Sequence, residues 1–238
     1  MKPVAIFRHS ATEGPGYFAI LLEQQGIPWQ LIAVDEAEKI PATADQYAGL
    51  CFMGGPMSVN DPLPWIDEVC ALIRDAAAKN IPVIGHCLGG QLISKALGGK
   101  ITANPIKEIG WGSVSSATNP ASQHWLGELA GQPVSVFHWH GETFSLPEQA
   151  QLLVSNRHCS NQMFALGPHL AMQCHVEMTP EMIIEWCAQW TDEAASTPNH
   201  VAIQSPSQMQ AETAQHLAGM RRLAEQIYSV WIAGLSRN

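Results

Sequence analysis

The stretch Ile81-Pro82-Val83-Ile84-Gly85-His86-Cys87-Leu88-Gly89-Gly90-Gln91 decides the fold, because an apolar run ends there in a cysteine flanked by glycines. The run is short and β-branched, which is typical of a buried parallel strand, and the residues from Leu92 onward predict a helix. Cys87 therefore lies on a tight strand-to-helix turn. Gly85 and Gly89 give the spacing G-x-C-x-G, in which small neighbours permit a strained turn that exposes a nucleophile. The alternative is a structural cysteine, since free Cys is often buried.

Length, charge and cysteine content narrow the class of protein. The 238 residues suffice for one large α/β domain with an extension. With 12 Lys and Arg against 21 Asp and Glu, the net charge is −9 and no basic block is present, so we expect neither nucleic-acid nor membrane partners. The 6 cysteines lack C-x-x-C spacing, which favours reduced thiols over a disulfide framework. The N-terminus lacks a signal-peptide pattern, and we expect a cytoplasmic protein.

The first half of the chain alternates predicted strands and helices. Apolar runs at 4–7, 29–34 and 47–53 predict strands, and helical patterns at 17–25 and 67–79 separate them. Such βα units predict an α/β fold with a mostly parallel central sheet flanked by helices.

The second half predicts a small antiparallel section, because short strands follow one another there without long helices. We expect these strands at 100–103, 111–116, 134–139, 152–155, 163–166 and 169–175. Thr179 is a suitable N-cap for a helix that follows it.

A C-terminal helical extension completes the prediction. A polar connector at 192–200 precedes Ser205-Pro206-Ser207-Gln208, which has the pattern of a capping box for a last helix. We therefore divide the chain into a main domain at 1–190 and an extension at 191–238. The apolar face of the last helix must be covered, either by the main domain or by a second copy of the chain in a homo-oligomer.

A thiol nucleophile needs a base, and the base needs a group that orients it. Among 10 histidines, His175 stands out because an apolar run ends on it and Glu177 follows two residues later. In an extended chain these side chains project to the same side, so Glu177 would hold one ring nitrogen while the other faces Cys87. His140-Gly141-Glu142 repeats the pattern and competes for the same role.

The histidines also raise the question of a metal site. His138 and His140 are two residues apart, and His158 or Cys159 could supply a further ligand. This spacing matches none of the zinc patterns. We therefore expect no metal, and nothing in the sequence indicates another cofactor.

Acyl transfer through Cys87 would place negative charge on a carbonyl oxygen, which main-chain N–H groups stabilise. The N–H of Leu88 is one suitable donor, because it follows the nucleophile at the start of a helix. Gly54-Gly55-Pro56 ends a neighbouring strand at the same sheet edge and would supply the second donor. Taken alone, this tripeptide equally predicts a simple turn.

Together, three ordered segments resemble the signatures of the class I (triad) glutamine amidotransferases, as in the amidotransferase domain of GMP synthetase. They are Gly54-Gly55-Pro56, the elbow at 85–91 and His175-Val176-Glu177. The segments 139–142 and 159–164 also resemble parts of stand-alone members. The resemblance covers roughly residues 45–190 and implies the flavodoxin-like fold of that family.

The resemblance also assigns roles to individual residues. It implies Cys87 as nucleophile, His175 as general base and then acid, and Glu177 as the orienting group, which decides against His140. It implies oxyanion donors at Gly55 and Leu88. It further implies substrate contacts from three residues, Gly54, Gln91 and Asn161.

Four positions depart from the usual pattern of the family. His86 stands where an apolar or aromatic residue is common, and Gly90 replaces the common His or Met. The usual His-Pro-Glu has Val176 at its centre, and Cys174 replaces an aromatic residue. The three residues of the implied triad are intact, so the departures concern the shape of the turn and the grip on the substrate.

The resemblance implies hydrolysis of the γ-amide of glutamine through a glutamyl thioester, with release of ammonia. In the family, ammonia normally travels to a synthetase domain, but only about fifty residues follow the main domain here. We therefore expect the ammonia acceptor on a separate synthetase subunit. One alternative is a stand-alone hydrolase of γ-glutamyl peptides or amides, and a second is a non-catalytic regulatory module.

Overall fold

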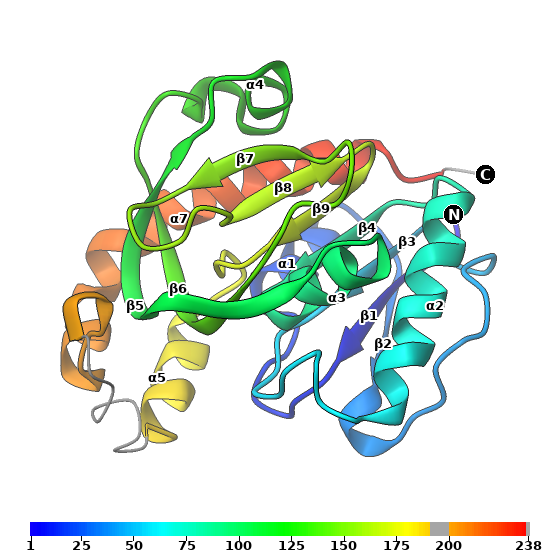
Figure 1. The fold of residues 1–238 in the computed structure, drawn as a ribbon, viewed down its shortest axis with the longest axis horizontal. Helices are drawn as coiled ribbons and strands as arrows, with labels where there is room; N and C mark the ends of the chain where they lie inside the picture. Colours follow the sequence, from blue (N-terminus) through cyan, green and yellow to red (C-terminus); the bar gives the residue numbers. More distant parts are fainter. Residues whose placement is uncertain (191–199, 237–238) are drawn as a thin grey trace.

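Figure 1 shows the chain as a computed structural model that describes residues 1–190 and 200–236. Within these residues, a nine-stranded sheet forms the centre and helices cover both of its faces. Five strands pair in parallel, and they are β1 (Val4–Arg8), β2 (Trp29–Ala33), β3 (Gly49–Phe52), β4 (Val83–His86) and β9 (His169–Met172). Their order in the sheet is β2-β1-β3-β4-β9, so the predicted α/β fold with a parallel core is confirmed.

Four further strands continue the sheet from β9 in antiparallel pairing. In their order across the sheet they are β8 (Met163–Leu166), β7 (Gln151–Ser155), β5 (Ile101–Ser116) and β6 (Val134–Phe144). The predicted antiparallel section is therefore present, and it is larger than the short predicted strands suggest. β5 and β6 form a long pair, one end of which lies beside α3 (Leu88–Ala96) (Figure 1).

The prediction of separate strands at 100–103 and 111–116 is wrong, because both belong to the 16-residue strand β5. Pro105 interrupts the strand pattern of the sequence, since proline has no N–H to donate to a partner strand. The chain nevertheless stays extended, and its pairing with β6 shifts register between Ala103 and Glu108. Such irregularities bend a strand and redirect its side chains, and this one lies beside the cavity described below.

The helices form two layers. α2 (Pro64–Ala78) and α3 (Leu88–Ala96) share one apolar core with one face of the sheet. α1 (Gly16–Gln24) and α7 (Pro206–Ala233) share a second core with the opposite face. The short helix α4 (Pro120–Leu126), which the sequence did not predict, also packs in this second core.

Two predicted caps are confirmed. The Thr179 hydroxyl accepts a hydrogen bond from the Met182 N–H at 3.3 Å, at the start of α5 (Pro180–Ala188). Ser205 and Gln208 form the predicted capping box of α7.

The C-terminal helix α7 is part of the same body as the sheet. Tyr228 and Trp231 are fully buried and pack edge-on against Phe18 of α1. The main domain therefore covers the apolar face of α7, which is the first of the two alternatives given for that face. The expected domain boundary at residue 190 adjoins residues that the structure does not describe, and the expected connector at 192–200 lies outside the described residues up to 199. In the described part of the chain, no helix combines the length and apolarity that a membrane span requires.

Candidate active site

Cys87 lies on a strained turn between β4 and α3, as its sequence neighbours predict. Its φ of 50° and ψ of −106° are costly for a residue with a side chain. A Cβ on Gly85 would collide with the main chain of Gly89, and a Cβ on Gly89 would collide with the carbonyl oxygen of Phe52. Both glycines are therefore required for the turn to pack against the sheet.

The departure at Gly90 has a similar physical reason. A Cβ at this position would collide with the carbonyl oxygen of Met172, which also accepts a hydrogen bond from the Cys87 N–H at 2.8 Å. The end of β9 thus passes so close to the turn that a larger side chain does not fit at residue 90.

Two glutamines stand behind the Cys87 thiol. Gln91 donates from Nε2 to Oε1 of Gln173 at 3.1 Å, and Gln173 Nε2 in turn lies 3.6 Å from the sulfur. The sulfur also lies 3.9 Å from the carbonyl oxygen of Trp139. Gln91, for which a substrate contact is expected, therefore also positions a neighbour of the thiol.

His175 and Glu177 form a short buried pair next to Cys87. The imidazole donates from Nδ1 to Glu177 Oε1 at 2.6 Å, and the other carboxylate oxygen accepts from the Val176 N–H at 2.9 Å. His175 Nε2 is buried and makes no hydrogen bond within the described residues. The ring of Trp186 meets the imidazole edge-on at 5.0 Å between centroids. One imidazole nitrogen is thus fixed, and the other is free.

The electrostatics of this pair favour a charged imidazole. Burial opposes the charge, but the Glu177 carboxylate and the neighbouring Cys87 sulfur outweigh burial and raise the pKa of His175 well above its usual value. Burial would likewise raise the pKa of Glu177, but the His175 charge and hydrogen bond lower it to about 2. Cys87 lies close to this pair, because the side chain of Gln173, two residues before His175, approaches the thiol at 3.6 Å.

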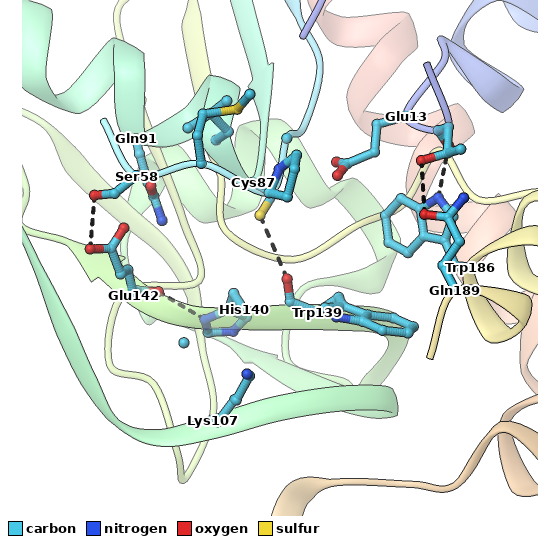
Figure 2. A pocket seen from close by; sticks show the side chains of 16 residues that line it. Glu13, Ser58, Cys87, Gln91, Lys107, Trp139, His140, Glu142, Trp186 and Gln189 are labelled. Atoms are coloured by element: carbon cyan, nitrogen blue, oxygen red, sulfur yellow. Dashed lines mark hydrogen bonds between the residues drawn. The ribbon is translucent and has the colours of Figure 1, made fainter. Parts of the chain in front are cut away.

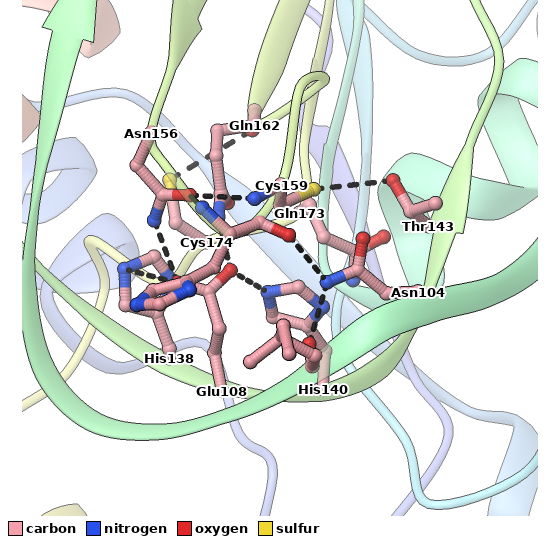
Figure 3. Close-up of polar contacts among 12 residues, drawn as sticks. Asn104, Glu108, His138, His140, Thr143, Asn156, Cys159, Gln162, Gln173 and Cys174 are labelled. Carbon is pink, nitrogen blue, oxygen red and sulfur yellow. Dashed lines mark hydrogen bonds and ion pairs between the residues drawn. The ribbon is translucent and has the colours of Figure 1, made fainter. Parts of the chain in front are cut away.

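The competing pattern at His140 is built differently (Figure 3). His140 Nδ1 donates to the main-chain oxygen of Glu142 at 2.9 Å, and its Nε2 lies 3.1 Å from Oε2 of Glu108. The Glu142 carboxylate instead accepts from the Ser58 hydroxyl at 3.0 Å. The acid that faces His140 is therefore Glu108 from β5. Nδ1 of this ring is hydrogen bonded, whereas Nε2 makes no hydrogen bond within the described residues but lies at ion-pair distance from the Glu108 carboxylate.

A cavity of about 460 Å³ opens over Cys87. Gly55 and Leu88 border it beside the thiol, and within the described residues neither N–H is hydrogen bonded to a main-chain oxygen. Figure 2 shows two ends on either side of Cys87. One end is lined by Ser58, Gln91, Lys107, His140 and Glu142, and the other is lined by Thr12, Glu13, Trp186 and Gln189.

Residues 21–183 match the family model of the class-I glutamine amidotransferases. The chain belongs to this family. A crystal structure of a glutamine amidotransferase from Methylobacillus flagellatus is 42% identical, with a TM-score of 0.96 over 100% of this chain and 97% of that one. The glutamine amidotransferase-like protein YfeJ of Salmonella typhimurium is 31% identical over 88% of this chain and 90% of its own length. Gamma-glutamyl peptidase 3 of Arabidopsis thaliana is 28% identical over 71% of this chain and 72% of its own length.

In this amidotransferase the group with the chemistry of metal ligands is Glu108, His140 and Cys159, whose ligand atoms lie within 4.8 Å of one another. Glu108 already accepts hydrogen bonds from Asn156 at 2.6 Å and from Gln162 at 2.7 Å, one on each oxygen. Although burial raises the pKa of Glu108, the two histidines beside it and the hydrogen bond from Asn156 lower it to about 2. Hydrogen bonds from two side-chain amides thus hold both oxygens of the Glu108 carboxylate.

Asn161, a substrate contact implied by resemblance, does not line the cavity of this amidotransferase. Its side-chain amide donates to the main-chain oxygen of Phe144 at 2.9 Å. The structure therefore brings together Cys87, His175 and Glu177, with Gly54, Gly55, Leu88 and Gln91 around them, but not Asn161.

Sequence reasoning missed Glu13, Gln173 and Trp186, which all lie at the site. Gln173 has a usable signal, because it precedes His175 by two residues in an extended segment and projects to the same side. Glu13 lies in a loop before α1, and Trp186 lies on α5, so only the tertiary fold brings them to Cys87.

Proposed function

We propose that the protein hydrolyses the γ-amide bond of glutamine or of a related γ-glutamyl compound, with Cys87 as nucleophile. One observation carries this proposal. The Cys87 thiol lies on a strained turn at the cavity, beside an imidazole whose Nδ1 is held by the buried Glu177 and whose Nε2 is free. A nucleophile, a base and a group that orients the base form the arrangement that acyl transfer requires.

In the first half of the reaction, His175 takes the proton of the Cys87 thiol, the sulfur bonds to the γ-carbonyl carbon, and the electron pair of the C=O π bond moves onto the oxygen. The N–H groups of Gly55 and Leu88 stabilise the negative oxygen of the tetrahedral intermediate. His175 then gives its proton to the departing nitrogen, the C–N bond breaks, and ammonia or an amine leaves. The glutamyl group stays on Cys87 as a thioester.

In the second half, His175 takes a proton from water, and the resulting hydroxide adds to the thioester carbon. The C–S bond breaks, the sulfur regains its proton from His175, and glutamate leaves. Glu177 keeps the imidazole in one orientation through both halves, since it holds Nδ1 at 2.6 Å.

The charges at one end of the cavity support a glutamyl substrate. Lys107 and Glu142 both line that end and carry opposite charges. They complement the α-carboxylate and the α-ammonium of a glutamyl group, which is a zwitterion. Ser58 holds the Glu142 carboxylate at 3.0 Å, and Gln91 lies beside it.

A second candidate function, hydrolysis of γ-glutamyl peptides or amides, is favoured by the other end of the cavity. The space continues past Cys87 to Glu13, Trp186 and Gln189, so a leaving group larger than ammonia has room there. The relative named gamma-glutamyl peptidase 3 supports this candidate. In the first candidate, ammonia would pass to an acceptor on a separate synthetase subunit, in the cytoplasm.

The test is glutamate release from L-glutamine and from a γ-glutamyl dipeptide, by the wild type and by Cys87→Ala. Release that depends on Cys87 supports the proposal, and the preferred substrate separates the two candidates. Mass spectrometry of the quenched reaction should find a glutamyl adduct on Cys87. Turnover of neither substrate, with a Cys87 thiol that iodoacetamide does not label and glutamine does not protect, would favour a regulatory module instead.

A further inference from the structure

The end of the cavity that faces away from Lys107 and Glu142 has a chemistry of its own. It is formed by Glu13, Thr12, Gln189 and the indole rings of Trp139 and Trp186, which we call the leaving-group end. Lys107, at the opposite end, is the only Lys or Arg among the described residues that line the cavity. The leaving-group end therefore combines one carboxylate with two indole rings. None of the described residues that line it is a Lys or Arg that could pair with this carboxylate.

Glu13 lies on the side of Cys87 from which the leaving group must depart. A Cβ on Gly54 would collide with the Glu13 carboxylate and would lie 3.4 Å from Cε1 of His175. The Glu13 carboxylate and the His175 imidazole therefore lie close to each other, next to Gly54. Because His175 is the group that protonates the departing nitrogen, the remainder of a leaving amine extends toward Glu13.

The backbone holds Glu13 in place, but its carboxylate has no partner among the described residues. The Glu13 N–H donates to the Ser10 carbonyl oxygen at 3.0 Å, and the Trp186 indole N–H donates to the Thr12 carbonyl oxygen at 2.8 Å. No residue in the described ranges 1–190 and 200–236 forms a hydrogen bond or an ion pair with the Glu13 side chain. Figure 2 shows this carboxylate pointing into the cavity between Cys87 and Trp186.

The electrostatic state of Glu13 fits a site that binds a cation. Burial raises the pKa of Glu13 to about 7, with the His175 charge opposing the shift and the Glu177 charge adding to it. A carboxylate that lacks a partner in such surroundings gains most from a ligand that brings a positive charge. The two indole rings at this end add further attraction for a cation that lies over a ring face.

Resting on the proposed function, we infer that the leaving-group end is a subsite for a cationic amine. The substrate class is then a γ-glutamyl amide whose leaving amine contains a positively charged group in addition to the departing nitrogen. That charged group lies between Glu13 and the two indole rings. An anionic leaving group, such as an amino acid with a free carboxylate, would meet the Glu13 charge and bind poorly.

The experiment measures binding, so that it does not depend on turnover. Isothermal titration calorimetry compares three γ-glutamyl amides of similar size on the inactive Cys87→Ala protein. They are the 3-aminopropylamide with a positive charge, the neutral butylamide, and the amide of β-alanine with a negative charge. We expect about 10-fold tighter binding of the cationic amide than of the neutral one, and weaker binding of the anionic one.

Two further variants in the Cys87→Ala background make the test specific. Glu13→Gln keeps the size of the side chain, and we expect the affinities for the three ligands to converge. Glu142→Gln removes a charge at the opposite end of the same cavity, so it should weaken all three ligands by a similar factor and leave their ranking intact.

Equal affinities in the parent protein, tighter binding of the anion, or a ranking that survives Glu13→Gln would overturn the inference. So would failure of all three amides to bind. Parallel turnover by the wild type separates this result from the proposed function. Hydrolysis without charge ranking contradicts only the cation subsite, whereas ranked binding without hydrolysis contradicts the catalytic proposal and leaves the subsite standing.

Discussion

Two buried pairs of histidine and glutamate lie near Cys87, and they differ in whether a carboxylate lies against Nε2 of the imidazole. His175 uses Nδ1 to hold Glu177 at 2.6 Å, and its Nε2 makes no hydrogen bond within the described residues. His140 uses Nδ1 on the Glu142 main chain at 2.9 Å and directs Nε2 to Glu108 at 3.1 Å. A carboxylate next to a histidine therefore does not by itself identify a base, because a base also needs an unoccupied nitrogen that faces the reacting group.

The two glutamates differ as well. Glu108 binds side chains from several segments, since Asn156 and Gln162 donate to its two oxygens while His140 approaches one of them. Glu177 receives one imidazole and the N–H of its own neighbour Val176. Glu108 thus links several segments of the antiparallel section, whereas Glu177 contacts one side chain, the imidazole of His175.

The largest expected effect separates the two histidines. His175→Ala should lower kcat/KM for glutamate release by about 10⁴-fold or more, because the proposed base and acid is lost. His140→Ala should cost less than about 10-fold, because this ring faces Glu108 and not the thiol. Steady-state kinetics on both variants, with circular dichroism as a folding control, makes the comparison. Equal losses would show that the free nitrogen of His175 is not what matters.

The glutamates form the next matched pair of variants. Glu177→Gln should lower kcat/KM by about 10²- to 10³-fold, less than loss of the nucleophile, because the orienting group is the least essential member of such units. It should also move the His175 ionisation to lower pH, because a buried negative charge that raises its pKa is gone. An NMR titration of the His175 Cε1–H measures this shift.

The control for that experiment is Glu108→Gln. Its amide nitrogen would face a donor from Asn156 or Gln162, so the free energy of unfolding should fall by about 1–3 kcal/mol. Activity should change by less than about 10-fold. A loss of activity as large as that of Glu177→Gln, without a loss of stability, would place Glu108 in the catalytic machinery.

Much of the proposed catalytic site could be predicted from local sequence, because the residues of each of its two motifs lie close together along the chain. Cys87 sits between glycines at fixed offsets, and His175 and Glu177 are two residues apart in extended chain, so the neighbours of each residue decide its geometry. Glu108 gave no such signal. It reaches His140 only because β5 and β6 pair across a shift in register, which the sequence does not encode in any short pattern.

The fold shows the same division. The parallel strands follow from βα units whose pattern repeats along the chain, and the capping box of α7 was readable from four residues. The continuity of β5 could not be predicted, because Pro105 interrupts the strand pattern of the sequence. The chain remains extended there because β5 pairs with β6 on both sides of this interruption. Glu13 was missed for a related reason, since a loop residue before α1 reaches Cys87 only through the order of the strands.

The pH dependence of stability should have opposite signs for histidines of the two regions. His138, next to Glu108, is fully buried, and desolvation lowers its pKa to about 3. The unfolded chain binds a proton there below its ordinary pKa while the folded chain does not, so acidification from pH 7 to pH 5 should cost about 2 kcal/mol of unfolding free energy for such a group. His175, whose pKa is raised, contributes stability that is present at low pH and is lost as the pH rises through its folded pKa.

Urea unfolding of the wild type and of His138→Asn at both pH values tests this sign. The variant should lose less stability than the wild type between pH 7 and pH 5. His9 and His169, whose burial lowers their pKa to about 4, remain in both proteins and supply the background slope. An identical pH dependence in the two proteins would mean that His138 is protonated in the folded state.

The smallest expected effect concerns a third histidine, His86, which lies next to the pair formed by His175 and Glu177. His86 is fully buried, with Nε2 2.7 Å from the Tyr228 hydroxyl of α7 and 4.0 Å from Glu177 Oε2. Tyr228→Phe should therefore lower the free energy of unfolding by about 1 kcal/mol, the net value of one hydrogen bond. It should change kcat/KM by less than about 3-fold, because Val176 and His175 already hold the two oxygens of Glu177. Thermal unfolding and steady-state kinetics measure the two effects. A loss of 10-fold or more in kcat at unchanged KM would show that the orientation of Glu177 depends on the C-terminal helix, and the catalytic pair would then reach as far as α7.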